Sequence, residues 1–218
     1  IAKYFTEEQN EKIRKQLNLI TGDVLFFISD SKYLINKLAG QIRTELATRM
    51  DLIKNDRFEF CFITDFPMYE LGVDGKIDFM HNPFSMPQGG IKALQEESPL
   101  DIKAYQYDIV CNGVELSSGA VRNHRIDIME KAFEIAGYSK DELESRFGAL
   151  YKAFQYGAPP HAGMAPGVDR MIMLLMGEEC IREIIAFPMT ANAEDLLMGA
   201  PGDVTEKQLR EVHIKMRT

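Results

Sequence analysis

The sequence predicts an α+β fold in which helices pack on an antiparallel β-sheet. Residues 58–66 are dense in aromatic and β-branched residues, which favours a central strand that ends before Pro67. Two further segments read as strands, residues 105–114 and residues 116–122, and no helical pattern lies between them. Strands that follow one another without helical crossovers pair antiparallel, with the helices placed on the sheet.

Residues 1–52 are predicted to form a unit of their own. Thr6 followed by Gln9 is a capping box, so a helix is expected from about Glu7 to Gln16. Residues 24–28 read as a short buried strand. A second, amphipathic helix is expected from about Lys32 to Met50. One strand and two helices cannot close a core alone, so we expect the tail of a larger domain.

Residues 53–218 are predicted to form the main domain. Asp74-Gly75 suits a tight hairpin turn. Residues 80–90 contain too many helix and strand breakers for regular structure, so we expect a loop, and loops often carry binding residues. Apolar residues from Met129 to Ala136 mark a helix that Gly137 stops.

The remaining elements follow from capping boxes and apolar spacing. Ser139 with Glu142 starts a helix that reaches about Gln155. Residues 183–187 read as a strand. A closing helix begins at Thr205, boxed with Gln208. Its expected inner face consists of Leu209, Val212 and Met216.

Composition narrows the class of protein. The chain has 218 residues, 45% of them hydrophobic and 27% charged, as in an ordinary globular protein. The net charge of −8 excludes a broad basic surface for nucleic acid, so any such contact is local. Three widely spaced cysteines read as buried thiols in a reducing compartment, and no apolar run is long enough for a membrane helix. Because the chain begins with Ile1 rather than methionine, we expect it to be a piece of a longer protein. The reducing compartment is expected to be the cytoplasm.

The most informative stretch runs from Gly157 to Met176. Gly163 and Gly167 allow close approach of the backbone to a ligand, and Asp169 with Arg170 then opens an apolar run. This predicts a strand or loop feeding a helix, with Arg170 at the helix start, where the free N–H groups favour an anion such as phosphate. An arginine in a surface ion pair is about as consistent with this stretch alone.

Two carboxylates lie on either side of Asn112-Gly113. Asp108 and Glu115 could converge on a hard divalent cation such as Mg²⁺, shared with substrate phosphates. Solvated residues beside a turn would show the same spacing. Arg122, which follows, could bind a substrate carboxylate through two parallel hydrogen bonds, or could pair with Asp127 on the surface.

These motifs resemble a known family. The stretch from 157 to 176 is similar to motif 3 of class II aminoacyl-tRNA synthetases, and residues 156–163 look like the aspartyl-tRNA synthetases of bacterial type. Residues 112–124 and the run Met80-His-Asn-Pro-Phe also resemble motifs of these enzymes, in the same order. Three departures from the common wording affect only pocket detail. They are Pro166, the pair Ser117 and Ser118, and Asn82.

The resemblance implies a fold and a set of site residues. The fold would be the C-terminal part of a class II catalytic domain, with residues 1–52 ending an inserted α/β domain. Arg170 and Glu115 would be catalytic, and Asp108 with Glu115 would hold Mg²⁺. Arg122 and His81 would bind aspartate, although a lone histidine is more often structural. ATP would contact Glu115, Gly167, Val168, Asp169 and Arg170.

The resemblance also implies partners and leaves rivals open. The whole enzyme would activate L-aspartate with ATP, charge the acceptor end of a tRNA, and form a homodimer without membrane contact. Motifs 1 and 2 have no match here, so we expect the 218-residue chain alone to be inactive. The rivals are a sibling enzyme that activates asparagine or lysine or makes asparagine from aspartate, and a non-catalytic paralogue that binds tRNA or protein. Whether asparagine tRNA is also charged cannot be read from these residues.

Overall fold

The computed structural model describes residues 2–54 and 56–217. It divides into two compact units, Ile1–Arg57 and Phe58–Thr218. The first unit has a short 3-10 helix, Ala2–Tyr4, and two α-helices, α1 (Glu7–Leu17) and α2 (Lys32–Arg49). Both α-helices were predicted. That this unit ends an inserted domain stays a prediction.

The caps explain where these helices begin. In α1 the Thr6 side chain accepts from the Gln9 amide, and the Gln9 side chain accepts from the Thr6 amide, which confirms the capping box. In α2 the Ser31 side chain accepts from the Leu34 amide. The strand predicted at residues 24–28 is wrong: this segment has no regular structure and Val24 is 73% exposed. Among the described residues of the first unit no strand is present to pair with it.

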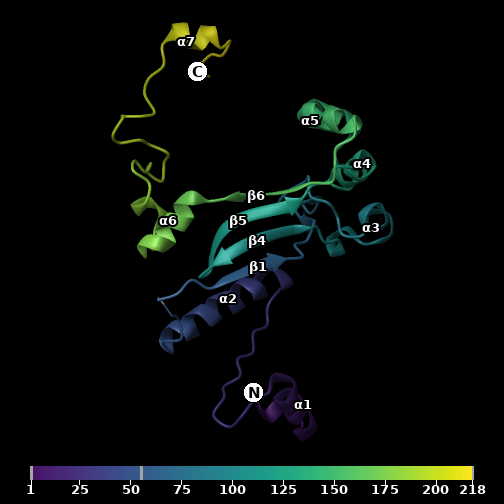
Figure 1. The fold of residues 1–218 in the computed structure, drawn as a ribbon, viewed down its shortest axis with the longest axis vertical. Coiled ribbons are helices and arrows are strands. Elements are labelled where there is room, and N and C mark those ends of the chain that lie inside the picture. The colour runs from purple at the N-terminus through teal and green to yellow at the C-terminus, as the bar shows by residue number, and fades with distance from the viewer. Residues whose placement is uncertain (1, 55, 218) are drawn as a thin grey trace. The chain divides into compact units, whose positions relative to one another are not determined.

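The second unit is built on a four-stranded antiparallel sheet, as predicted. Its strands are β1 (Phe60–Thr64), β4 (Gln106–Cys111), β5 (Val114–Val121) and β6 (Ala162–Pro166), in the order β1-β4-β5-β6 (Figure 1). The prediction that the first strand is central is wrong. β1 lies at an edge of the sheet and all of its residues are exposed, although its composition is that of a buried strand.

The turn between β4 and β5 corrects a predicted boundary. The first of the two strands ends at Cys111, not at residue 114, because Asn112 and Gly113 both take left-handed backbone conformations, with φ of 49° and 83°. Two such residues form a tight hairpin turn whose twist matches that of the flanking strands. A register shift between Ile109 and Val110 follows in the ladder.

A small hairpin precedes the loop at residues 80–89. β2 (Tyr69–Leu71) pairs antiparallel with β3 (Ile77–Phe79). The predicted turn at Asp74-Gly75 is confirmed, with φ of 76° at Gly75. The loop itself is irregular, as predicted, and leads into α3 (Gly90–Glu96) and a 3-10 helix, Pro99–Asp101, which the sequence reading missed.

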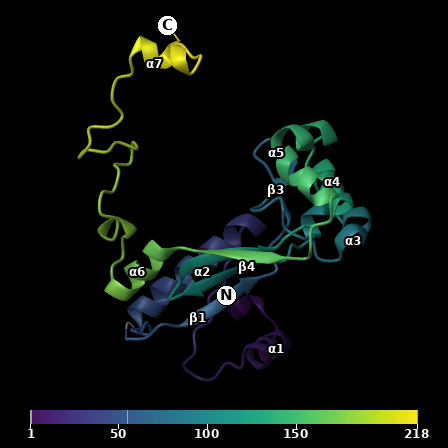
Figure 2. The same cartoon turned by 45° about the horizontal axis from the view of Figure 1, so that its top comes forward.

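The buried core lies where the helices meet this end of the sheet. α4 (Ile126–Ile135) and α5 (Lys140–Gln155) were both predicted, and they group with α3 at the same end of the sheet in two views (Figure 1, Figure 2). Met129 and Ala132 of α4 are fully buried, and α5 contributes Leu143 and Tyr151. The capping box of Ser139 and Glu142 is confirmed.

The C-terminal segment corrects three predictions. α6 (Val168–Met176) follows β6, but residues 183–187 form no strand. A 3-10 helix, Ile181–Glu183, and bends occupy this region. α7 (Glu206–Glu211) begins with the predicted capping box at Thr205 but is short. Leu209 is buried, whereas Val212 and Met216, predicted on the inner face, are exposed.

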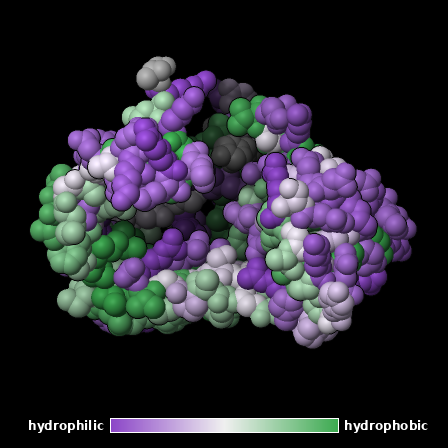
Figure 3. Space-filling model, turned by 90° about the horizontal axis from the view of Figure 1, so that it is seen from above, coloured by the Kyte–Doolittle hydropathy of each residue, from purple (hydrophilic) through white to green (hydrophobic). Residues whose placement is uncertain are grey.

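Exposed apolar residues are numerous in this segment. They include Leu175 and Met176 of α6 and Leu196 to Met198. In the face drawn in Figure 3, hydrophobic residues gather at the left. The cysteine prediction is also partly wrong, because Cys111 is buried but Cys61 and Cys180 are exposed. None of the described helices has the length and apolar character needed to cross a membrane.

Candidate functional site

The pairing of β4 with β5 places three predicted site residues on one face of the sheet. Asp108 lies opposite Ser118, and Val110 lies opposite Glu115 because of the register shift. Opposed residues share a face, and so do residues two apart on one strand. Asp108 and Glu115 therefore face the same side. Arg122, four residues beyond Ser118, continues the same alternation just past the end of β5.

Arg122 is anchored through its backbone, and its guanidinium is left available. Its amide donates to the carbonyl of His161 at 2.9 Å. A Cβ placed on Gly163 of β6 would lie 3.9 Å from Nη2 of Arg122, so the guanidinium lies over this glycine. Among the residues that the structure describes, the half-buried guanidinium has no hydrogen bond or ion pair.

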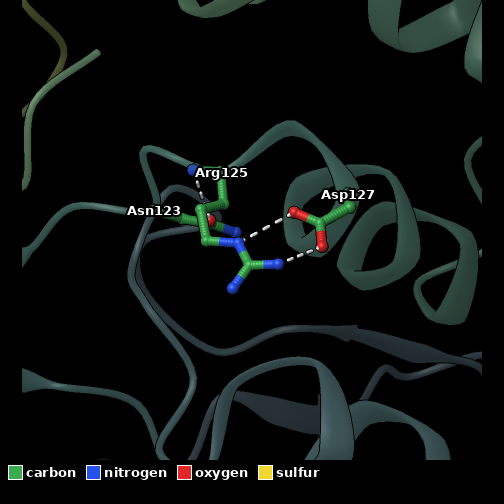
Figure 4. Close-up of polar contacts among 3 residues, drawn as sticks. All are labelled: Asn123, Arg125 and Asp127. Carbon is green, nitrogen blue, oxygen red and sulfur yellow. Dashed lines mark hydrogen bonds and ion pairs between the residues drawn. The ribbon is translucent and has the colours of Figure 1, made fainter. Parts of the chain in front are cut away.

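The surface pairing of Arg122 with Asp127 is wrong. Asp127 is held by Arg125, whose Nε and Nη2 donate to the two carboxylate oxygens at 3.1 and 2.5 Å (Figure 4). This bidentate contact lowers the pKa of Asp127 and raises that of Arg125. The fully buried Asn123 accepts from the Arg125 amide at 3.3 Å. Asp127 is therefore not the partner of the Arg122 guanidinium.

The second arginine, Arg170 of α6, contacts the other end of β5. Arg170 is the third residue of α6, and its Nη1 donates to the carbonyl of Glu115 at 2.7 Å and to Glu115 Oε1 at 2.9 Å. The two side chains are 44% and 47% exposed. The ion-pair alternative for Arg170 is thus present in the structure. An ion pair this open is weak, and a more highly charged anion can compete for the arginine.

The start of α6 is suited to an anion. Gly167 is its N-cap and no side chain caps the helix, so the first-turn N–H groups of Val168 and Asp169 lack the usual side-chain acceptor. The Gly167 amide itself donates to Leu116 O at 2.7 Å, which ties the helix start to β5. The positive end of the helix dipole adds to the charge of Arg170.

His81 lies in the loop that borders Arg122. Its ring is exposed and makes an edge contact with Phe66, with ring centres 5.3 Å apart. Further along the loop, Ser85 forms an isolated bridge with Arg122, and the Met86 amide donates to Val121 O at 2.8 Å. The base of the His81 loop is therefore paired with the end of β5.

Comparison with known protein families identifies the family of this chain. Residues 3–191 match the family model described as tRNA synthetases class II (D, K and N). The chain belongs to this family.

The relatives of this synthetase chain are long proteins. It is 55% identical over 221 residues to the aspartate–tRNA(Asp/Asn) ligase of Rickettsia bellii and 57% identical over 217 residues to that of Nitrobacter hamburgensis. It is also 55% identical over 218 residues to the aspartate–tRNA ligase of Streptomyces avermitilis. These matches cover 99%, 99% and 100% of the chain, and the chain spans 37% of the length of each relative.

The donor set of this synthetase chain fits Mg²⁺ held jointly with phosphates. No group of three or more His, Cys, Asp or Glu side chains forms a metal cage within residues 2–54 and 56–217. Asp108 and Glu115 instead offer two carboxylates on one face of the sheet. Mg²⁺ keeps several waters and is commonly bound by one or two carboxylates together with substrate phosphates. The arrangement therefore suits a metal that arrives with a nucleotide.

Sequence reading missed two buried polar residues beside this site. Gln106 of β4 is 6% exposed and Ser85 of the loop is fully buried. The Gln106 Nε2 donates to Ser85 Oγ at 2.9 Å. The sequence signal for Gln106 was its place in an alternating strand, on the same face as Asp108. A buried polar side chain needs a hydrogen-bond partner, but the sequence does not show which residue that partner is.

Proposed function

We propose that the protein carrying this chain is an aspartate–tRNA ligase and that this chain supplies most of its aspartate pocket. The observation that supports this is the guanidinium of Arg122, half-buried over Gly163, on the carboxylate-bearing face of the sheet, and without a partner among the described residues. Its backbone ties leave it able to bind a carboxylate through two hydrogen bonds. The relatives are named as aspartate–tRNA ligases, which agrees with aspartate as the amino acid.

Charge accounts for the choice of aspartate over asparagine. A carboxylate neutralises Arg122, whereas an amide of the same shape leaves the guanidinium partly desolvated and unpaired. A penalty of about 3 kcal/mol corresponds to roughly 100-fold discrimination. His81, in the loop beside Arg122, would add a ring N–H donor for the same carboxylate.

The reaction requires positioning more than acid–base help. The α-carboxylate of aspartate attacks the α-phosphorus of ATP, the bond to the bridging oxygen of pyrophosphate breaks, and aspartyl-adenylate forms. A hydroxyl of the terminal ribose of tRNA then attacks the aspartyl carbonyl and AMP leaves. Bringing the reactants together and neutralising charge contribute most of the acceleration in such a step.

The residues of this chain divide these tasks. Arg122 and His81 hold and orient the substrate aspartate. Arg170, released from Glu115, pairs with the terminal phosphate of ATP, whose charge is also stabilised by the start of α6 at Gly167, Val168 and Asp169. Asp108 and Glu115 would hold Mg²⁺, which would neutralise phosphate charge when bound. Glu115, no longer paired with Arg170, would be free for this role.

The wider assignments rest on the relatives and on the resemblance. We propose that the whole protein is a homodimer and that it acts on the acceptor end of a tRNA. The relatives carry two names, one for aspartate tRNA and one for both aspartate and asparagine tRNA, so both substrates should be assayed. A non-catalytic paralogue would have no use for Asp108, Glu115, Arg122 and Arg170 together.

Exchange of radioactive pyrophosphate into ATP tests the proposal. The assay uses the full-length protein with Mg²⁺ and with aspartate, asparagine or lysine. We expect exchange with aspartate and at least about 100-fold less with the other two, in line with the penalty at Arg122. Exchange with asparagine or lysine alone would identify a sibling enzyme, and none with any of the three would favour the paralogue.

A further inference from the structure

A buried hydrogen bond joins strand β4 to the loop that carries His81. Gln106 lies in β4, two residues before Asp108 and on the same face. Its Nε2 donates to Ser85 Oγ at 2.9 Å and, at 3.4 Å, to the carbonyl of Asn82. Gln106 is 6% exposed and Ser85 is 0% exposed. Both are far removed from solvent, so each depends on the other to satisfy its hydrogen-bonding groups.

The same short segment closes on itself as a turn. The Ser85 amide donates to Asn82 O at 3.2 Å, and the Phe84 amide donates to Asn82 Oδ1 at 2.9 Å. Gln106 contacts both ends of this turn, one through a side chain and one through a carbonyl. The turn directly follows His81 in the chain, so the position of the turn determines the position of His81.

The far side of the turn is tied to the specificity arginine. Ser85 bridges to Arg122, and the Asn123 amide donates to Phe84 O at 2.7 Å. Residues 84–86 are therefore hydrogen-bonded to the backbone of residues 121–123 around the isolated bridge of Ser85 with Arg122. The Gln106 side chain holds the turn through Ser85 and Asn82, while the backbone of residues 121–123 holds it through main-chain hydrogen bonds.

We infer that Gln106 is a positioning residue for the amino-acid pocket. Through Ser85 it fixes the position of the His81 loop relative to Arg122, so that the histidine and the arginine face the same substrate carboxylate. This inference rests on the proposed function for its substrate. The geometry of the turn is independent of that function. We propose that Gln106 and Ser85 act through the His81 loop and do not touch the substrate.

Two substitutions test the link, Gln106→Leu and Ser85→Ala, separately and combined, in the full-length protein. We expect each single change to raise the KM for aspartate at least about fivefold, with the KM for ATP and kcat changed less than twofold. Because both changes break one hydrogen bond, the double variant should resemble the worse single variant rather than their product. Ser85→Ala removes only a hydroxyl and keeps the test valid if Gln106→Leu does not fold.

Tyr151→Phe is the matched control. Tyr151 is buried in α5, and its hydroxyl donates to Glu130 rather than to any residue of the turn. This variant loses a partly buried hydrogen bond, so its Tm should fall, but the KM for aspartate should stay unchanged. Equal effects on Tm with no change in the KM for aspartate in Ser85→Ala and Gln106→Leu would overturn the inference.

Amide hydrogen exchange separates this inference from the proposed function. In Ser85→Ala we expect the amides of Phe84 and Ser85 to exchange at least about tenfold faster, while those of α5 do not change. Unchanged protection would contradict the positioning role, whether or not the protein is active. If wild-type protein lacks aspartate-dependent pyrophosphate exchange while Ser85→Ala shows the expected loss of amide protection, the proposed function alone is refuted.

Discussion

The two ends of β5 are built in different ways. At the Arg122 end, backbone hydrogen bonds tie residues 121–123 to the loop and to His161, and the buried contact between Gln106 and Ser85 holds the loop to β4. At the Glu115 end, β5 is linked to the start of α6 by one backbone hydrogen bond, from Gly167 to Leu116, and by the half-exposed contact of Arg170 with Glu115. Neighbouring apolar residues of α6 are exposed. One end is held rigidly by buried contacts and the other is not.

This difference bears on how the proposed substrates bind. A guanidinium whose backbone is fixed on several sides loses little freedom when a carboxylate binds, so the amino-acid end is pre-organised. Binding of the proposed nucleotide would break the ion pair of Arg170 with Glu115 and would bring the start of α6, a metal ion and phosphates together. We therefore expect amino-acid recognition to reside in the described residues, and nucleotide binding to reorganise its surroundings.

Removing the arginine of the ordered end should have the largest effect. Arg122→Leu is expected to lower kcat/KM for aspartate in pyrophosphate exchange at least about 100-fold, because the substrate carboxylate loses its charge partner. Arg125→Leu is the control, since Arg125 pairs with Asp127 on the surface. Its kcat/KM should stay within about twofold of wild type. Equal losses in both variants would point to general damage.

The open end should be more tolerant. Arg170→Ala is expected to raise the KM for ATP about 10-fold or more, while the free energy of unfolding changes by less than about 1 kcal/mol, because the ion pair is half exposed. Steady-state kinetics at saturating aspartate and chemical denaturation measure the two effects. A large loss of stability with an unchanged KM for ATP would make Arg170 structural.

A glycine tests the rigidity of the sheet itself. A Cβ on Gly119 of β5 would lie 2.5 Å from the Tyr107 ring and 2.6 Å from Gly163 O, and Tyr107 Oη donates to that carbonyl at 3.2 Å. Gly119→Ala should therefore destabilise the protein by about 1–3 kcal/mol. Gly148→Ala, in α5 with open space around it, should be neutral or slightly stabilising. Thermal unfolding of both variants decides the point.

The smallest effect concerns pH. Arg125 lowers the pKa of Asp127, so the pair stabilises the folded state fully above the ordinary carboxyl pKa of 3.8 and loses this contribution as the pH falls below it. Asp127→Asn should lower the Tm slightly at pH 7, because the side chain is 53% exposed. The difference from wild type should shrink as the pH falls toward 3. A constant difference would show that charge is not its source.

Local signals predicted the fold well where they specify local structure. The capping boxes at Thr6, Ser139 and Thr205 and the turn at Gly75 depend on neighbouring residues alone, and all four are confirmed. Residues 24–28 and 183–187 failed because a strand needs a partner elsewhere, which apolar composition cannot supply. β1 has the composition of a central strand but lies at the edge for the same reason.

The site was predicted only in part. Spacing alone left Asp108, Glu115, Arg122 and Arg170 undecided, and the resemblance to a family selected their roles, which stay predictions. The shared sheet face depends on a register shift at Val110 that no local pattern announces. The contact between Gln106 and Ser85 joins residues 21 positions apart, so it is visible only in three dimensions.

Aspartate binding in the absence of ATP tests the contrast between the two ends most directly. Calorimetric titration of the full-length protein should compare wild type with Arg170→Ala. Because the Arg122 end is already formed, we expect aspartate to bind both proteins without nucleotide, with dissociation constants within about twofold of each other. Binding that requires ATP, or that disappears in Arg170→Ala, would contradict a pre-organised amino-acid pocket.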